Sequence, residues 1–300
     1  MSSVSATMIS LRPLLFFIVM CMPIGMSAAA RAAGSIVWFH SDFPPLSIVN
    51  GPDKGRGAAD QWGVFLQQQL PDFQHELIAA NTLRIQEEMK HRDNACNYAF
   101  LKTAEREKLF LFSEPLASIQ PSGLITLRSR EKELAPFLND RGELRLQALI
   151  ATQKFRIAAA AGRSFGHVID EALLAGHEDG KLVPFTTSDL FSSGLLQILN
   201  KQGIDALPGY AMELSWAAQR FNLPPDRFWF LPVEGQTDLL PVHVACSRSP
   251  IGEQIISQIN ELIRAGKLPE VASQAYRGWL PADVARHYDR QRKATGRHSQ

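Results

Sequence analysis

The stretch Asn97-Tyr-Ala-Phe-Leu-Lys-Thr-Ala-Glu-Arg106 contains a strand-like segment that ends directly in a polar turn. Its aromatic residues Tyr98 and Phe100 favour a buried strand. Thr103 and Arg106 follow at once, where a strand of an open α/β sheet leads into a ligand crevice. An arginine there suits a carboxylate or phosphate, because its guanidinium presents a planar fork of donors. In the alternative interpretation, Arg106 is a solvated surface charge or pairs with a neighbouring glutamate.

Outward from this stretch, strand-like and helix-like segments alternate, which predicts an α/β fold. Strands are expected at 34–40, 73–80, 124–127, 155–161, 204–210, 228–233 and 239–246. Helices are expected after Asp60, at 81–91, after Ser164, after Ser188 and at 251–263. Asp60, Asn81 and Ser164 are the residue types that cap helix N-termini, and Gly266 is typical of a helix end. The charged segment 128–133 is interpreted as a crossover, and the polar tail from 287 is expected to be disordered.

The amino-terminal residues 1–33 are interpreted as an export signal. Arg12 precedes the apolar run 14–22, which is long enough for a signal peptide and too short to span a bilayer. Small residues then favour cleavage near Ala33. A lipid anchor on Cys21 is disfavoured, because the residues before it are large. The prediction is a soluble protein of the periplasm.

Export leaves 29 basic and 30 acidic residues, because Arg12 and Arg31 are removed with no acid, so the formal charge becomes −1. This balance argues against a nucleic-acid partner, which needs a clustered basic face. Two cysteines remain, Cys96 and Cys246. In an oxidising compartment their even number favours a disulfide, although two buried free thiols are the alternative.

Other candidate ligand contacts lie at predicted strand exits. Phe43 is held at the end of the first strand by Pro44 and Pro45, and it offers either a flat wall for a ligand or an ordinary core side chain. Ser164 opens a helix, either as a cap alone or as part of an anion site. Tyr210 ends the strand at 204–210. A phosphate loop at Gly55-Arg-Gly57 is disfavoured, because no Lys-Ser/Thr pair follows it.

In this order, the pieces resemble a bacterial extracellular solute-binding protein of family 3, the amino-acid-type periplasmic binding proteins. The resemblance covers nearly all of the mature chain. The motifs that carry it are Phe43-Pro-Pro45, Gly57 before the first helix, Thr103-Ala-Glu-Arg106 with Ser113-Glu-Pro115, Gly203-Ile-Asp-Ala206 and the helix that ends at Gly266. They match the family's Thr-x-x-Arg, Ser-x-Pro and Gly-x-Ile-Asp-Ala patterns.

The resemblance implies a two-lobed fold of periplasmic-binding-protein type II, with a ligand cleft between lobes joined by two crossover strands. The expected ranges are 34–125 for the first part of lobe 1, 126–237 for lobe 2, 238–286 for the return to lobe 1 and 287–300 for the tail. The lobes of this family close around the ligand by a hinge motion.

Residue by residue, the resemblance assigns Arg106 to the ligand carboxylate, with Thr103 in the same turn. Phe43 matches the aromatic wall, and Arg163 with Ser164 matches the helix start of the second lobe. Two residues depart from the family pattern. They argue against an ordinary α-amino acid as the ligand and indicate a divergent branch. Leu101 replaces a small hydroxyl residue, and Tyr210 replaces the Asp that receives the ligand's ammonium group.

The resemblance thus implies a monomeric binding protein for a small carboxylate-bearing ligand, serving an ABC-type importer or a membrane sensor. The alternative is an enzyme on the same fold, similar to a cyclohexadienyl dehydratase. His40 and His75 are its candidate acid or base residues. No catalytic constellation, zinc spacing or nucleophile elbow surrounds them, so neither a catalytic residue, a metal nor a cofactor is predicted.

Overall fold

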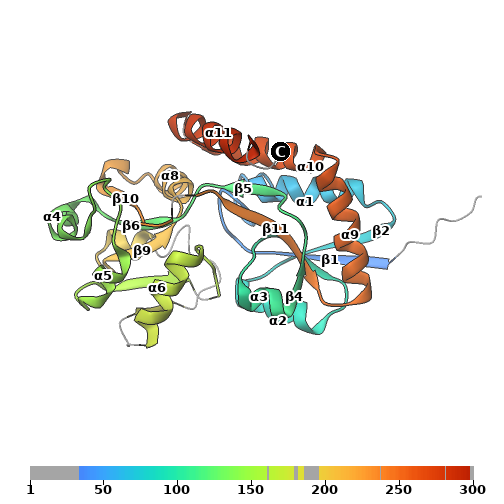
Figure 1. Ribbon diagram of the computed structural model, residues 1–300, viewed down its shortest axis with the longest axis horizontal. Coiled ribbons are helices and arrows are strands. Elements are labelled where there is room, and N and C mark those ends of the chain that lie inside the picture. The colour runs from blue at the N-terminus through green and yellow to red at the C-terminus, as the bar shows by residue number, and fades with distance from the viewer. Residues whose placement is uncertain are drawn as a thin grey trace, which may run out of the picture. The chain divides into compact units, whose positions relative to one another are not determined.

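The computed structural model describes residues 34–160, 162–178, 182–185, 196–236, 238–280 and 282–297. The predicted export signal and Ser188 lie outside these ranges. Within them, no helix combines the length and the apolar character needed to cross a membrane. The strands form two separate sheets, which confirms the predicted α/β class (Figure 1). We call the two parts built on these sheets lobe 1 and lobe 2.

The sheet of lobe 1 has the strand order β2-β1-β3-β11-β4, with β5 paired to β11. Its strands are β1 (Gly34–His40), β2 (Phe73–Ala79), β3 (Ala95–Leu101), β4 (Phe110–Phe112), β5 (Ala117–Ile119) and β11 (Leu240–Ser247). β3 and β2 run parallel to β1, and β11 runs antiparallel to β3, β4 and β5. Because β1 and β3 are parallel, the turns that carry Phe43 and Arg106 leave the same edge of the sheet.

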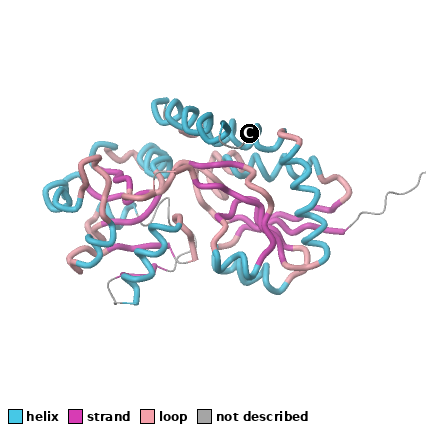
Figure 2. Tube along the Cα trace, viewed as in Figure 1, coloured by secondary structure: helices cyan, strands magenta, loops and turns pink. Residues whose placement is uncertain are grey.

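Helices cover both faces of this sheet (Figure 2). They are α1 (Ala58–Gln69), α2 (Thr82–His91), α3 (Ala104–Leu109), α9 (Pro250–Arg264), α10 (Lys267–Arg277) and α11 (Ala282–Arg297). α1, α9 and α10 share one apolar cluster, whereas Ile85 and Met89 of α2 join Val37 and Phe39 in another. The predicted cap at Asn81 is confirmed, since its side chain accepts the Arg84 N–H at 2.8 Å.

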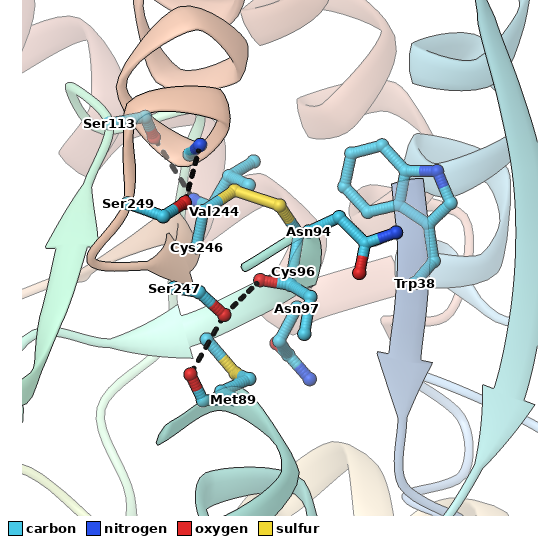
Figure 3. The surroundings of a disulfide bond; sticks show 12 residues. Trp38, Met89, Asn94, Cys96, Asn97, Ser113, Val244, Cys246, Ser247 and Ser249 are labelled. Atoms are coloured by element: carbon cyan, nitrogen blue, oxygen red, sulfur yellow. Dashed lines mark hydrogen bonds between the residues drawn. A yellow bond between two sulfur atoms is a disulfide. The ribbon is translucent and has the colours of Figure 1, made fainter. Parts of the chain in front are cut away.

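A disulfide joins Cys96 on β3 to Cys246 on β11, two residues directly opposite each other in the antiparallel ladder (Figure 3). This confirms the predicted bridge. Both cysteines are fully buried, beside Trp38 of β1. The bridge spans 150 residues, and a loop of that length corresponds to about 5 kcal/mol of stabilisation in the chain-entropy model. It also encloses all of lobe 2, because the chain leaves and re-enters lobe 1 between the two cysteines.

The sheet of lobe 2 has the strand order β10-β6-β9-β7-β8. Its strands are β6 (Gly123–Leu127), β7 (Ile157–Ala160), β8 (Leu182–Phe185), β9 (Ala206–Gly209) and β10 (Phe228–Pro232). Its helices are α4 (Glu131–Leu134), α5 (Leu146–Ala151), α6 (His167–Glu178), α7 (Leu196–Asn200) and α8 (Ala211–Arg220). The apolar residues of β6, β7 and β9 form the centre of a separate core.

The first crossover lies earlier than predicted. β6 pairs with both β9 and β10, and all five of its residues are buried, so it is an inner strand of lobe 2. The chain therefore passes between the lobes at residues 120–122, and not after 125 or within 128–133. The segment 128–134 instead forms a 3-10 turn (Arg128–Arg130) and α4. The return falls between β10 and β11, and the predicted boundary residue 237 lies outside the described residues.

The expected disorder of the tail from 287 is wrong as far as residue 297, because α11 continues through this region. Its anchor is Tyr288, which is fully buried and packs its ring against Tyr276 of α10 at 5.2 Å. The Tyr288 hydroxyl donates to the carbonyl oxygen of Ser118 on β5. A mostly polar sequence therefore folds as a helix because Tyr288, with Ala285 beside it, packs into the lobe 1 core and Asp289 pairs with Arg277 of α10.

The assignment of Asp60 as an N-cap is also wrong. α1 begins at Ala58 with Gly57 as its N-cap, so Asp60 is the third helical residue. Its carboxylate turns back and accepts the N–H of Gly57 at 3.0 Å. This is the acidic half of a capping box.

Candidate functional site

Arg106 lies in the first turn of α3, three residues after the N-cap Thr103. The Thr103 hydroxyl oxygen accepts the Arg106 N–H at 3.2 Å. The side chain of Arg106 is buried, with 7% of its surface exposed, and it makes no ion pair with Glu105 or Glu107. Glu107 pairs with Lys102 instead. The interpretation of Arg106 as a solvated surface charge is therefore wrong.

The guanidinium of Arg106 contacts backbone of both lobes. Nη1 donates to the carbonyl oxygen of Leu101 at 2.8 Å, and Nη2 donates to that of Gly162 in lobe 2 at 2.9 Å. The guanidinium carbon also lies 4.5 Å from the ring centroid of Phe100. Burial lowers the pKa of Arg106 to about 10, although the charge of Asp170 opposes this shift. The side chain remains cationic at neutral pH.

Gly162 is the lobe 2 residue that meets Arg106. Its φ of 73° lies in the left-handed region, which favours glycine. Its carbonyl oxygen also accepts from the side-chain amide of Gln86 in lobe 1 at 3.2 Å. A Cβ atom at this position would lie 2.6 Å from Cδ2 of Leu83, another lobe 1 residue. Only a glycine fits this approach without displacing Leu83.

The next residue, Arg163, extends from lobe 2 onto Phe43 of lobe 1. Its guanidinium carbon lies 3.6 Å from the Phe43 ring centroid, 5.0 Å from that of Phe165 and 5.5 Å from that of Tyr210. The rings of Phe43 and Tyr210 are 5.8 Å apart. The two rings predicted to enclose a ligand thus lie together, and the guanidinium of Arg163 lies over the face of Phe43.

Glu213 neutralises Arg163, and sequence reasoning missed it. Nη1 and Nη2 of Arg163 donate to the two carboxylate oxygens of Glu213 at 3.0 and 2.8 Å. Oε2 of Glu213 also accepts the N–H of Tyr210 at 2.9 Å, because Glu213 is the third residue of α8 and Tyr210 is its N-cap. Burial raises the pKa of Glu213 to about 7, although Arg163 opposes the shift. A glutamate three residues after a strand exit was the available sequence signal.

The two residues that depart from the family pattern, Leu101 and Tyr210, have structural roles. Leu101 contacts Arg106 through its backbone oxygen, so no side-chain hydroxyl is needed for that bond. Tyr210 has 2% of its surface exposed and belongs to the apolar cluster of lobe 1, although it follows β9 of lobe 2. Its side chain therefore joins the two lobes.

Ser164 is not an N-cap. α6 begins at His167, and the Ser164 hydroxyl donates to the carboxylate of Asp170 in the first turn of the helix. The same carboxylate accepts the N–H of Phe165 at 2.7 Å. Burial raises the pKa of Asp170, against the opposing effect of these hydrogen bonds and of Arg106. The predicted ligand contact of Ser164 remains a prediction.

The two crossovers meet beside this site. The side-chain amide of Gln236, on the return crossover, donates to the Ser122 hydroxyl oxygen at 2.9 Å. Both side chains also donate to the backbone oxygen of Phe165. All these groups are buried, so the hinge region is tied to the segment that carries Arg163.

The candidate catalytic histidines lie in lobe 1, and among the described residues neither forms a hydrogen bond or ion pair with Arg106, Arg163 or Glu213. His75 uses both ring nitrogens: Nδ1 accepts from the Trp38 indole at 3.0 Å, and Nε2 contacts the backbone oxygen of Leu70 at 3.0 Å. His40 contacts the Ser47 hydroxyl through Nδ1 at 3.0 Å. Among the described residues, no group of three or more His, Cys, Asp or Glu side chains is placed to hold a metal ion.

Comparison with known proteins identifies the fold of this chain. A scan against protein-family models finds no match, and a search of curated proteins finds none either. Solved structures do match. An ancestral arginine-binding protein bound to arginine has a TM-score of 0.61 at 16% sequence identity, over 84% of this chain and 100% of its own.

Two further structures come from a transporter and from a sensor. An amino acid ABC transporter substrate-binding protein from Streptococcus pneumoniae, bound to L-arginine, has a TM-score of 0.57 at 16% identity, over 81% of this chain and 93% of its own. A histidine kinase sensor domain with similarity to periplasmic binding proteins has a TM-score of 0.60 at 12% identity, over 81% and 96%. This chain therefore has the two-lobed α/β fold of periplasmic binding proteins.

Proposed function

We propose that this protein is a periplasmic solute-binding protein, a divergent relative of the amino-acid-type family, that captures a small carboxylate-bearing ligand between its two lobes. The observation that carries the proposal is the environment of the Arg106 side chain. Its guanidinium is buried where the lobes meet and contacts both of them, and within the described residues no carboxylate pairs with it.

The electrostatics of Arg106 favour an anionic ligand. The two carbonyl oxygens that it contacts are neutral acceptors, so its positive charge stays uncompensated at hydrogen-bond distance. Charge-assisted bonds to a carboxylate are roughly twice as strong as bonds to neutral acceptors. A ligand carboxylate that replaces the Gly162 oxygen would therefore bind more strongly than the contact it displaces, and it would still bridge the lobes.

The surrounding residues favour a ligand without an α-ammonium group. Tyr210 offers no carboxylate, and the nearby Glu213 is engaged by Arg163 on both of its oxygens. Phe43 would provide a flat apolar wall for the ligand body, with Thr103 and Ser164 near its polar ends. Arg163 lies over Phe43, so it must move aside or join the ligand contact when a ligand enters.

Partners and location follow from the same proposal. The structural neighbours include a protein of an ABC transporter and a sensor domain of a histidine kinase, so delivery to an importer and signalling to a membrane sensor are both supported. The predicted export signal supports a periplasmic location for the mature chain, which belongs to the same proposal. We propose that it acts there as a monomer, without nucleic acid.

A thermal-shift screen of the chain from residue 34 onward tests the proposal. The compounds are small acids, amino acids and short peptides, each at millimolar concentration. A ligand at about one hundred times its Kd stabilises the folded state by about 2.7 kcal/mol. The expected result is stabilisation by an acid that lacks an α-ammonium group. Stabilisation by neutral or cationic compounds alone would contradict the carboxylate assignment.

We propose binding without catalysis, in place of the dehydratase-like alternative. Both ring nitrogens of His75 are used inside lobe 1, and Nδ1 of His40 is directed to Ser47, so neither histidine reaches the interlobe contacts through these atoms. Incubation of the pure protein with prephenate-like acids should show binding at most. Release of an aromatic product at a rate proportional to protein concentration would favour the enzyme.

A further inference from the structure

A cavity of about 220 Å³ lies inside lobe 1, apart from the interlobe residues. It is enclosed by α1, β2 and the loop between β1 and α1. Its walls are apolar, formed by Ile48, Val49, Val64 and Leu77. At about 30 Å³ per water molecule, the volume equals that of about seven waters, which is enough for one substituted benzene ring.

The floor of the cavity is a preorganised polar network centred on Asp60. One carboxylate oxygen accepts the Ser47 hydroxyl at 2.7 Å and the Tyr98 hydroxyl at 3.4 Å. The other accepts the N–H groups of Ile48 at 2.9 Å and Gly57 at 3.0 Å. Burial would raise the pKa of Asp60, but the interactions with His40, Ser47 and the N–H groups of Ile48 and Gly57 outweigh it, and the pKa falls below its usual value. Asp60 therefore positions its neighbours and has no capacity left for a ligand.

The same network determines which nitrogen of His40 carries a proton. Ser47 has one hydroxyl proton and gives it to Asp60, so the 3.0 Å contact between Ser47 Oγ and His40 Nδ1 requires Nδ1 to donate. In the neutral ring, Nε2 is then an acceptor. His40 lines the cavity, and Nε2 makes no hydrogen bond within the described part of the chain.

The mouth of the cavity combines a cation with exposed apolar side chains. Lys54 is exposed and forms no ion pair with any residue that the structure describes. Val64 and Leu77 are large apolar residues that leave 51% and 52% of their surfaces exposed. Grouped exposed apolar side chains mark ligand or partner sites more often than single ones do.

We propose that this cavity binds a small phenolic acid. The phenol hydroxyl would donate to Nε2 of His40 at the floor, the ring would lie between Leu77 and Ile48, and the carboxylate would meet Lys54 at the mouth. Convergent polar groups at the ends of an apolar pocket are typical of small-molecule sites. This site is separate from the interlobe site, because its lining residues include neither Arg106 nor Phe43, although Ser47 at its floor pairs with Phe43 through two backbone hydrogen bonds.

Titration of the chain from residue 34 onward with 4-hydroxybenzoate, followed by nitrogen-15 NMR, tests the proposal. Saturable shifts should appear at the amides of Lys54, Val64 and Leu77. Benzoate lacks the hydroxyl and 4-hydroxybenzyl alcohol lacks the carboxylate, and each should bind about three- to tenfold more weakly, since one hydrogen bond or exposed ion pair is removed. No saturable shift with 4-hydroxybenzoate, or equal affinity for all three probes, would overturn the proposal.

Two variants complete the test. Lys54→Gln should weaken 4-hydroxybenzoate binding about threefold, whereas Lys90→Gln, a matched change on the surface of α2, should leave it unchanged. Val64→Trp should abolish binding, because the larger side chain fills the mouth. Equal affinities in the parent and in both lysine variants, or shifts that map to Phe43 and Arg106, would overturn the proposal, and the lysine variants decide the matter even if Val64→Trp fails to fold.

Discussion

Two buried arginines meet at the lobe boundary from opposite sides, and their charges are compensated in different ways. Arg106 of lobe 1 is held by two backbone oxygens and a phenyl ring. Arg163 of lobe 2 is held by a bidentate carboxylate, Glu213, and lies on Phe43. Both side chains are largely buried, so burial alone does not distinguish them.

The difference separates a binding residue from a structural one. A buried cation without a carboxylate partner is costly, and a bound anion reduces that cost. A cation that already has a bidentate carboxylate gains less from a ligand. We therefore expect Arg106 to determine affinity for the acid group and Arg163 to determine how readily the cleft opens. The predictions below test this assignment, from the largest expected effect to the smallest.

Arg106→Ala should weaken binding of the acid identified in the thermal-shift screen by about 2–5 kcal/mol, because the ligand carboxylate is left desolvated and unpaired. Arg106→Lys should recover only part of this loss, since an ammonium group cannot form the bidentate fork. Isothermal calorimetry on the parent and both variants measures the effect. Circular dichroism provides the control for folding. Parent-like affinity in both variants would assign Arg106 a purely structural role.

How far the sequence predicts this site depends on the range of each interaction. The position of Arg106 is encoded locally, because Thr103 caps the turn that contains it. Phe43 is likewise fixed by the prolines that follow it. Glu213 was missed because its partner Arg163 lies 50 residues away. Sequence spacing does not report such a tertiary pair.

The same distinction explains the corrected elements of the fold. β6 was split by the predicted lobe boundary because its apolar run does not reveal which sheet it joins. The tail was predicted to be disordered because Tyr288 is a single aromatic residue in a polar segment, and its partners Tyr276 and Ser118 are distant in sequence. Ser164 was misassigned because Asp170 competes for its hydroxyl. Element types were predictable, whereas pairings between elements were not.

The second prediction concerns the charge on Glu213, whose pKa burial raises to about 7 from a usual value of 4.5. The folded state then binds the proton more tightly than the unfolded state does. The protonated Glu213 carboxyl therefore contributes to the free energy of unfolding. This contribution is fully present below about pH 4.5 and is lost as the pH rises through 7. The full shift corresponds to about 3 kcal/mol. Below pH 7 the Glu213 carboxyl becomes neutral, so Arg163, like Arg106, would have no ionised carboxylate as its hydrogen-bond partner.

Urea unfolding of the parent and of Glu213→Gln between pH 4.5 and 8 measures this contribution. The stability of the parent relative to the variant should fall as the pH rises, by up to about 3 kcal/mol. Glu114→Gln is a matched control, because Glu114 forms an exposed pair with Arg264. Parallel pH profiles for the parent and Glu213→Gln would show that Glu213 is ionised throughout and that the two arginines stay different.

The third prediction concerns Gly162, which presents its carbonyl oxygen to Arg106. Gly162→Ala should cost about 1–2 kcal/mol for the left-handed φ of 73° and more for the contact with Leu83. Gly142→Ala supplies the control, because Gly142 has a φ of 76° and open space around the added methyl group. Thermal unfolding of both variants should show a larger loss for Gly162→Ala. Equal losses would mean that the contact between Gly162 and Leu83 contributes nothing to stability.

The smallest effect, and the one whose sign is most informative, is expected from Arg163. Its guanidinium covers the face of Phe43 that the ligand body would use, and a cation–π contact of this kind is worth about 0.5–2 kcal/mol. The double variant Arg163→Met with Glu213→Gln removes the cation without leaving a buried carboxylate unpaired. If Arg163 only covers Phe43, a ligand no longer has to displace it. Its affinity, measured by calorimetry, should then rise by about fivefold, which corresponds to about 1 kcal/mol. If Arg163 instead contacts the ligand acid, the same variant should lose affinity as Arg106→Ala does. If the Arg163 double variant gains affinity while Arg106→Ala loses it, Arg106 binds the ligand and Arg163 obstructs access to Phe43. If both variants lose affinity, arginines of both lobes hold the ligand acid.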